Sequence, residues 1–291
     1  MSIRLIAIDI DGTLTPSSGA PISTRNRAAL RAAQAAGVEI VIATGRREAY
    51  AMPLVGPLGL TEDSVMISSN GAVVRSFGGE LFGRSFLGRE SARRLCRELR
   101  AWETLVFTFD RPGAGALVVE DFVQVRARIE RWVDANRPYL IEVRPIEAAF
   151  DGADLPIQGM VCGTVEEMRR AHAHLLALGM EGEVALHRTE YGARDLCILD
   201  LLALGCSKGV ALADLARRRS LAPEEVMAIG DNLNDLEMLE FAGRPVVMGN
   251  AQEELLGIAQ QQGWTITETN DRDGVASAVE SALKPAVAVE C

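Results

Sequence analysis

The sequence is poor in cysteine, and its cysteines form no pairing motif. Five occur among 291 residues, an odd number, and no two are spaced as CxxC. Such usage is typical of a protein of the reduced cytosol rather than of a secreted, disulfide-stapled one. We expect the internal cysteines to serve as small buried apolar side chains.

The sequence also has no long apolar run and no basic excess. No segment approaches the ~20 apolar residues that a membrane-spanning helix needs. Arg4, Asp9 and Asp11 interrupt the apolar N-terminal stretch, so the layout of a signal peptide is missing. The formal net charge is −10, whereas nucleic-acid backbones favour basic patches. We therefore expect a cytoplasmic protein with neither a nucleic acid nor a membrane as partner.

The most informative stretch lies near the N-terminus, where two acids follow a buried strand. Residues 6–14 read IAIDIDGTL, an apolar β-branched run that ends in Asp9 and Asp11. Side chains two apart on a strand share one face, so these acids would repel each other without a cation. Gly12 permits a sharp turn of the backbone, and ligands of open α/β sheets bind at this edge. The pattern predicts a metal-dependent site with a carboxylate nucleophile.

Strands and helices alternate at both ends of the chain. Strands predicted at residues 38–43, 65–68, 226–229 and 245–248 alternate with helices, which indicates an α/β fold with a Rossmann-like parallel sheet and helices on both faces. Neighbouring strands in the middle of the chain indicate an inserted α+β cap domain with an antiparallel sheet. We expect a catalytic core of residues 1–83 and 188–291, a cap of residues 84–187, and a disordered tail over residues 285–291.

Four loops that follow predicted strands carry unusual polar residues. Besides the acids at 9 and 11, these are Thr44, Lys208, and the pair Asp231 and Asp235. Each alone has a structural explanation as a turn, a helix cap or a solvated side chain. Together they supply what phosphoryl transfer requires: a nucleophile, a cation site, a hydroxyl donor and an ammonium group.

These loops resemble the motifs of the haloacid dehalogenase superfamily. Residues 9–14 (DIDGTL), 43–46 (ATGR), 207–209 (SKG) and 230–235 (GDNLND) are similar to its four motifs in order. The strings SNGA at 69–72, MGNA at 248–251 and DGVA at 273–276 resemble the Cof-type branch (cap type IIB). That branch carries its cap between the second and third motifs, where the insert lies here.

The resemblance implies a division of labour between the first two acids. Asp9 attacks phosphorus and becomes an aspartyl-phosphate, while Asp11 protonates the leaving alcohol and later activates water. The resemblance also implies a Mg²⁺ site made of the Asp9 carboxylate, the Asp11 backbone carbonyl and Asp231, with Asp235 supporting the metal shell or orienting Lys208. Oxygen ligands of this kind suit Mg²⁺, which pairs readily with a substrate phosphate.

The resemblance further implies a binding site for the transferring phosphoryl group. Thr44 and Lys208 bind it, beside Gly45, and Asn234 contacts the phosphate or a metal-bound water. Two side chains keep alternative interpretations: Arg46 either helps to bind phosphate or lies on the surface, and His187 either faces a substrate or forms the hinge to the insert.

The combined expectation is a Mg²⁺-dependent phosphatase acting on a small-molecule phosphate ester, in particular a sugar phosphate. An acid at position 11 is what protonation of a sugar alkoxide requires, whereas the dehalogenases of this superfamily carry an aromatic residue there. Two alternatives remain open at this point. One is a phosphomutase, which returns the phosphoryl group to another hydroxyl, and the other is a non-catalytic ligand-binding protein on the same fold.

Overall fold

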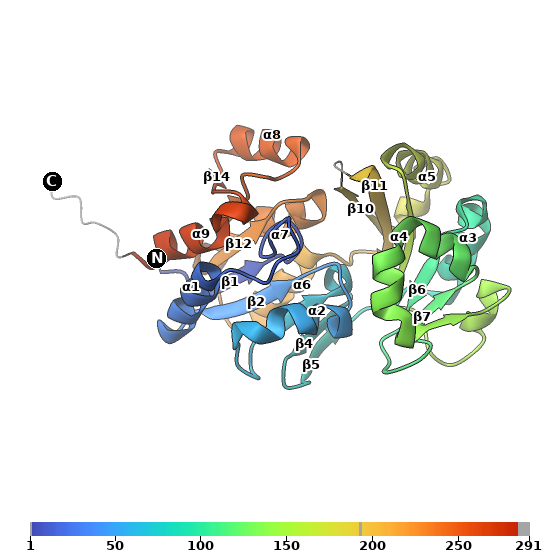
Figure 1. Cartoon of the computed structure of the whole chain (residues 1–291), viewed down its shortest axis with the longest axis horizontal. Helices are drawn as coiled ribbons and strands as arrows, with labels where there is room; N and C mark the ends of the chain where they lie inside the picture. Colours follow the sequence, from blue (N-terminus) through green and yellow to red (C-terminus); the bar gives the residue numbers. More distant parts are fainter. Residues whose placement is uncertain (1, 192–193, 285–291) are drawn as a thin grey trace.

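The computed structural model describes residues 2–191 and 194–284 and has two units, each built on its own β-sheet (Figure 1). The predicted disordered tail, residues 285–291, lies outside the described residues. An eight-stranded sheet has the order β14-β13-β12-β1-β2-β3-β4-β5. Its strands are β1 (Leu5–Ile8), β2 (Glu39–Ala43), β3 (Val65–Ser68), β4 (Val73–Ser76), β5 (Leu81–Arg84), β12 (Val226–Gly230), β13 (Arg244–Val247) and β14 (Thr265–Ile266).

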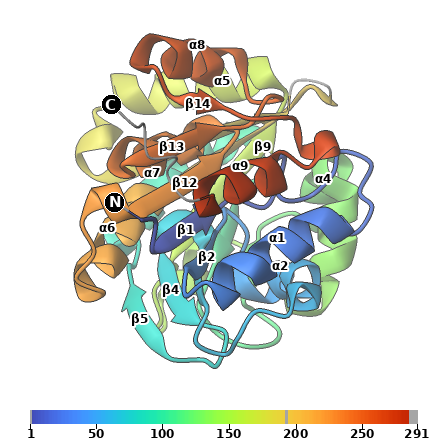
Figure 2. The ribbon, with the colours of Figure 1, turned by 90° about the vertical axis from the view of Figure 1, so that its left-hand side faces the viewer.

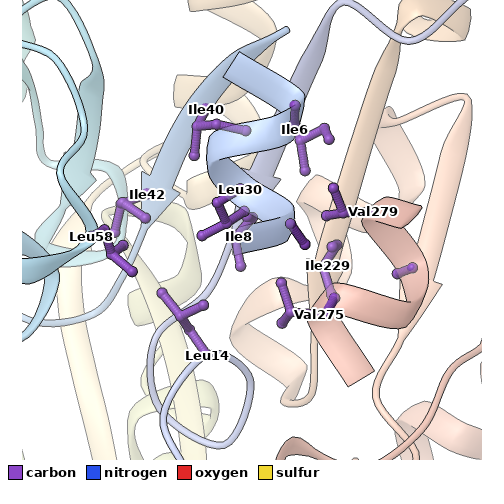
Figure 3. Packing of buried hydrophobic residues seen from close by; sticks show 14 of the residues in the cluster. Ile6, Ile8, Leu14, Leu30, Ile40, Ile42, Leu58, Ile229, Val275 and Val279 are labelled. Carbon is purple, nitrogen blue, oxygen red and sulfur yellow. The ribbon is translucent and has the colours of Figure 1, made fainter. Parts of the chain in front are cut away.

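Helices cover both faces of this sheet, as the alternation in the sequence predicted (Figure 2). They are α1 (Thr24–Ala35), α2 (Glu48–Val55), α6 (Lys208–Arg218), α7 (Leu236–Phe241), α8 (Glu253–Gln262) and α9 (Gly274–Leu283). Successive residues of β1 point to opposite faces. Ile6 and Ile8 pack with Leu30 of α1 and Val275 of α9, as Figure 3 shows, whereas Leu5 and Ala7 pack on the face covered by α6, α7 and α8.

The predicted parallel sheet is confirmed from β14 to β3, but its other edge is an antiparallel hairpin. Strands β3, β4 and β5 pair antiparallel, with an irregularity between Val74 and Arg75. The sequence prediction missed this hairpin. Its strands are only four residues long and are separated by a glycine-containing turn, so they carry little periodic signal.

The second unit is a six-stranded sheet of order β10-β11-β9-β6-β7-β8. All its neighbours pair antiparallel except β7 and β8, which are parallel. Helices α3 and α5 pack on one face and α4 on the other. The elements are β6 (Val106–Thr108), β7 (Leu117–Val119), β8 (Leu140–Glu142), β9 (Gln158–Gly163), β10 (Val184–Tyr191), β11 (Leu196–Ala203), α3 (Arg89–Leu99), α4 (Phe122–Asn136) and α5 (Val165–Ala177).

Strand pairing supports a second boundary at Ala203 for this unit, whereas the sequence prediction placed it at residue 187. Strand β11, assigned to the core from its sequence, pairs antiparallel with both β9 and β10. Its apolar pattern shows that it is buried but not which sheet it joins, which explains the error. We propose the core as residues 2–84 and 204–284, and name residues 85–203 the insert.

Candidate active site

The polar loops predicted from the sequence meet at one edge of the eight-stranded sheet. Strands β12, β1, β2 and β3 are neighbours and run parallel, so the loops after them lie side by side. Strand β1 lies between β2, which follows it in the chain, and β12, which comes much later in the chain. The strand order therefore reverses beside β1, and such a switch point is where ligands of α/β sheets bind. Gly12 turns the chain here with φ of +78°, and a Cβ at this position would lie 2.2 Å from Asp231 Oδ2.

Lys208 is the centre of the buried part of the site. Ser207 caps α6 by accepting a hydrogen bond from the Val210 amide at 3.1 Å, which places Lys208 at the first position of the helix. Its ammonium group donates to Asp9 Oδ1 and to Asp235 Oδ1, both at 2.6 Å. The Lys208 side chain is 0% exposed. The second oxygen of Asp235 accepts the backbone amides of Asp231 and Asn232 at 3.0 and 3.1 Å.

The buried charges at this edge do not balance. Asp9, Asp231 and Asp235 offer carboxylate oxygens within 4.8 Å of one another, and Lys208 supplies one positive charge. Burial raises the pKa of Asp9 to about 7 even though Lys208 opposes the rise. Burial, followed by the charge of Asp9, raises the pKa of Asp231 well above its usual range. Burial alone would lower the pKa of Lys208, but Asp235 and Asp9 raise it above its ordinary value. A cation bound here would relieve this repulsion.

The donor set fits a hard divalent cation. Asp231 Oδ1 accepts a hydrogen bond from Thr13 Oγ1 at 2.7 Å, which fixes that carboxylate. Within residues 2–191 and 194–284, Asp231 Oδ2 and the second oxygen of Asp9 accept no hydrogen bond and are left as ligands. Both oxygens of Asp235 are engaged, one by Lys208 and the other by the backbone amides of the loop after β12. Carboxylate oxygens without nitrogen or sulfur ligands favour Mg²⁺ or a similar ion.

Asp11 lies apart from this cluster and is held by Arg46. The guanidinium of Arg46 donates to both carboxylate oxygens of Asp11, each at 2.6 Å, and stacks 4.3 Å from the ring centre of Tyr50. Burial would lower the pKa of Arg46, but Asp11 raises it overall. Arg46 is thus a partly buried side chain that contacts Asp11, and its role toward phosphate stays a prediction.

Thr44 and Gly45 lie where the sequence predicted them, at the end of β2. The Thr44 side chain is buried and its oxygen accepts the Arg46 amide at 3.1 Å, which leaves the hydroxyl proton free to be donated. Gly45 lines the cavity described below and lies close to the side chain of Asn70.

Asn234 belongs to a chain of side chains that joins the core to the insert. It donates to Asn70 Oδ1 at 3.0 Å, and Asn70 in turn donates to Asp200 Oδ2 at 2.8 Å. The other oxygen of Asp200 accepts Gln158 Nε2 at 2.7 Å. Burial raises the pKa of Asp200 to about 7. The sequence analysis included Asn70 only as part of the SNGA string and did not connect it with Asp200.

A cavity of about 600 Å³ lies between this edge and the insert. Alternate residues of β9 and β11 form part of its wall, namely Gln158, Met160, Leu196, Ile198 and Asp200. Asp9, Asp11, Arg46 and Asn234 line it from the core. Such a volume is typical of a small-molecule site.

The cavity also contains residues that sequence reasoning missed. The start of α2 contributes Arg47, α4 contributes Arg128 to Trp132, and the turn after β10 contributes Arg194. Tyr191 lines the cavity, whereas His187 bonds the Cys206 carbonyl oxygen at 3.0 Å, at the return to the core. His187 thus contacts the segment that joins β11 to the core and does not line the cavity.

The chain belongs to the haloacid dehalogenase-like hydrolase family, whose model matches residues 6–279. The predicted resemblance, including the Cof-type branch, is thereby confirmed. Phosphatase YwpJ of Bacillus subtilis is 31% identical over 97% of this chain and 100% of its own length. The 5-amino-6-(5-phospho-D-ribitylamino)uracil phosphatase YcsE of the same organism is 30% identical, over 96% and 95% of the two chains.

A solved structure agrees with this assignment. A haloacid dehalogenase-like hydrolase from Bacteroides thetaiotaomicron superimposes with a TM-score of 0.77 at 30% identity, and the match covers 96% of this chain and 99% of that one. Within its family, the chain is an enzyme of the phosphoric monoester hydrolase class. No helix in the described ranges has the length and apolar character to cross a membrane.

Proposed function

We propose that the protein is a Mg²⁺-dependent phosphatase that hydrolyses a small phosphorylated metabolite, in particular a sugar phosphate, through an aspartyl-phosphate. The observation that carries this proposal is the contact of Lys208 with Asp9. It lies beside Asp231, whose negative charge no cation of the described residues neutralises, and Asp9 lines a cavity of small-molecule size. The phosphatase YcsE, whose name places a phosphorylated ribityl group in its substrate, supports a substrate of this chemistry. The cytoplasmic location expected from the cysteine usage belongs to the same proposal.

Asp9 is the proposed nucleophile. Lys208 holds Oδ1 of its carboxylate. The oxygen that does not hold the metal forms the new bond to phosphorus while the bond from phosphorus to the substrate oxygen breaks. Lys208 opposes the rise in the pKa of Asp9 that burial causes, and it orients the Asp9 carboxylate. Together with the Thr44 hydroxyl and Asn234 it would bind the phosphoryl oxygens. Gly45, the residue after Thr44, also lines the cavity.

Asp11 is the proposed general acid and base. It would give a proton to the departing alkoxide and then take one from the water that attacks phosphorus, which restores the Asp9 carboxylate. Arg46 fixes the Asp11 carboxylate, so release of one Arg46 hydrogen bond must accompany the proton transfer.

Asp9, Asp231 and the backbone carbonyl of Asp11 would hold Mg²⁺, with Asp235 in support. The bound ion supplies charge screening, which lets a carboxylate approach a phosphate dianion.

Asp9→Asn tests the proposal through phosphate release from p-nitrophenyl phosphate with Mg²⁺. We expect release to fall to background, while undiminished turnover would remove Asp9 as nucleophile. Incubation with sugar 1-phosphates separates the remaining alternative, because an isomerised sugar phosphate without free phosphate would identify a phosphomutase.

A further inference from the structure

Helix α4 is broken where it faces the cavity. Ile129, in the middle of the helix, has φ of −133° and ψ of 51°, far from helical values. A regular helix presents only one face to a neighbour. Here all five residues from Arg128 to Trp132 line the cavity. The break therefore brings both Arg128 and Arg131 to the wall opposite the catalytic edge.

The charge of this wall is opposite to that of the protein. Arg128, Arg131 and Arg194 line it from the insert, and Arg47 lines the same cavity from the core, in a chain whose formal net charge is −10. Arg128 is paired with Glu167 at 3.1 Å. Arg131 and Arg194 form no ion pair with any acid of residues 2–191 and 194–284.

The acids near this wall are already engaged. Glu130, the acid between the two arginines of α4, pairs with Arg126 at 2.8 Å. Asp200 accepts hydrogen bonds from Asn70 and Gln158. Neither acid neutralises Arg131 or Arg194 within the described ranges.

Arg47 adds a partly desolvated charge to the same cavity, from the core, where its side chain contacts the insert. Its Nε donates to Asn136 Oδ1 at 3.1 Å, and its guanidinium lies 3.7 Å from the ring centre of Tyr139. Its Nη2 is buried without a hydrogen-bond partner among the described atoms. A buried, unsatisfied guanidinium nitrogen costs free energy unless a ligand supplies an acceptor.

The positive groups at the catalytic end have partners or a proposed ligand of their own, unlike Arg131 and Arg194. Lys208 donates to Asp9 and Asp235, which leaves one N–H for the transferring phosphoryl group, and Arg46 is paired with Asp11. The transferring phosphoryl group belongs at that end, beside Asp9. The guanidinium groups of Arg131, Arg194 and Arg47 therefore face a part of the substrate other than the group that is transferred.

We propose that the substrate carries a second anionic group, a phosphate or a carboxylate, and that Arg131 and Arg194, assisted by Arg47, determine specificity for it. The planar guanidinium donates two parallel hydrogen bonds to such groups, which suits both chemistries. Trp132, Met160 and Ile198 provide apolar contacts for the body of the molecule between its two charged ends. This inference rests on the proposed phosphatase function.

Three phosphate esters that share a sugar-like body test the proposal. Fructose 1,6-bisphosphate carries a second phosphate, 6-phosphogluconate a carboxylate, and glucose 6-phosphate no second anion. We would measure kcat and KM with Mg²⁺ for the wild type, Arg131→Gln, Arg194→Gln and the double variant. Arg170→Gln is the matched control, because Arg170 is also an exposed arginine of the insert, forms no ion pair within residues 2–191 and 194–284 and does not line the cavity.

We expect kcat/KM to be about tenfold or more higher for at least one doubly anionic ester than for glucose 6-phosphate, as one charge-assisted hydrogen bond would give. The double variant should lose this preference through KM with little change in kcat, and Arg170→Gln should keep it. Equal kcat/KM for glucose 6-phosphate and for both doubly anionic esters would overturn the inference. A preference for a second anion that survives the double variant would overturn it as well.

Binding to Asp9→Asn, measured by calorimetry, separates this inference from the proposed function. Anion-selective binding that is lost in the Arg131→Gln/Arg194→Gln background, without turnover by the wild type, would sink the phosphatase proposal alone. Turnover of all three esters without anion-selective binding would sink the second-anion proposal alone.

Discussion

Arg46 donates to both carboxylate oxygens of Asp11, with each donor–acceptor distance at 2.6 Å. This pairing ties the end of β2 to the end of β1. It also places the proposed general acid beside, rather than inside, the cluster of Asp9, Asp231 and Asp235. Arg46 thus acts as a positioning residue for Asp11.

Arg46→Met should lower kcat roughly 10- to 100-fold, because the freed Asp11 carboxylate samples geometries that do not face the leaving oxygen. Steady-state kinetics with p-nitrophenyl phosphate and with an alkyl phosphate check this. The alkyl ester should suffer more, since its leaving group depends more on protonation. Arg25→Met, which removes a surface contact to Glu280, is the control. An equal loss on both esters would contradict the positioning role.

Lys208→Met should destabilise the fold by about 3–5 kcal/mol, because it leaves Asp9 and Asp235 buried without their cation. Urea unfolding without added metal measures this. The sequence offers a matched control, since its only other lysine is Lys284. Lys284→Met should leave the free energy of unfolding unchanged. A loss below about 1 kcal/mol in Lys208→Met would mean that the ammonium adds little to the buried cluster.

Mg²⁺ should stabilise the protein through Asp231. A ligand that binds only the folded state adds about 2.7 kcal/mol at about 100 times its Kd, so the melting temperature should rise with metal. Asp231→Asn should abolish most of the rise, and EDTA should remove activity from the wild type. The exposed Asp214→Asn is the control. A melting temperature of the wild type that does not respond to Mg²⁺ would argue against the site.

Asp200 should make stability fall as the pH rises. Its folded pKa of about 7 exceeds the ordinary value of about 4, so the folded state binds more protons than the unfolded state between these limits. The contribution of Asp200 to the free energy of unfolding is thus fully present below about pH 4, falls between pH 4 and pH 7 and stays constant at higher pH. The total change has an upper bound of about 4 kcal/mol.

Asp200→Asn removes this dependence. The difference in unfolding free energy, wild type minus Asp200→Asn, should therefore decrease from pH 4 to pH 7. Unfolding curves across this range provide the measurement. A flat difference would show that Asn70 and Gln158 keep Asp200 ionised throughout.

The buried half of the site could be predicted from the sequence because it depends on strand order. Asp9, Thr44 and Asp231 each follow a parallel strand, and the carboxyl ends of parallel strands share an edge. Ser207 starts a helix in a recognisable way, so Lys208 could be placed as well. Local signals were enough to bring these four side chains together.

The side of the site formed by the insert could not be predicted in the same way. The contact of Asn70 with Asp200 joins residues 130 positions apart, and no local pattern encodes it. Arg131 lies on a helix whose break at Ile129 has no proline or glycine to signal it. The place of strand β11 could not be predicted either, because its apolar residues would be buried equally well in either sheet.

The most direct test of the account is to trap the intermediate on Asp9. Borohydride reduces an acyl phosphate to an alcohol, so treatment of the enzyme during turnover should convert Asp9 into homoserine, which peptide mass spectrometry can locate. We predict that this conversion occurs at Asp9, requires substrate and Mg²⁺, and is absent from Asp9→Asn. Reduction at Asp11 in place of Asp9, or steady turnover with no reducible acyl phosphate, would contradict the proposed chemistry.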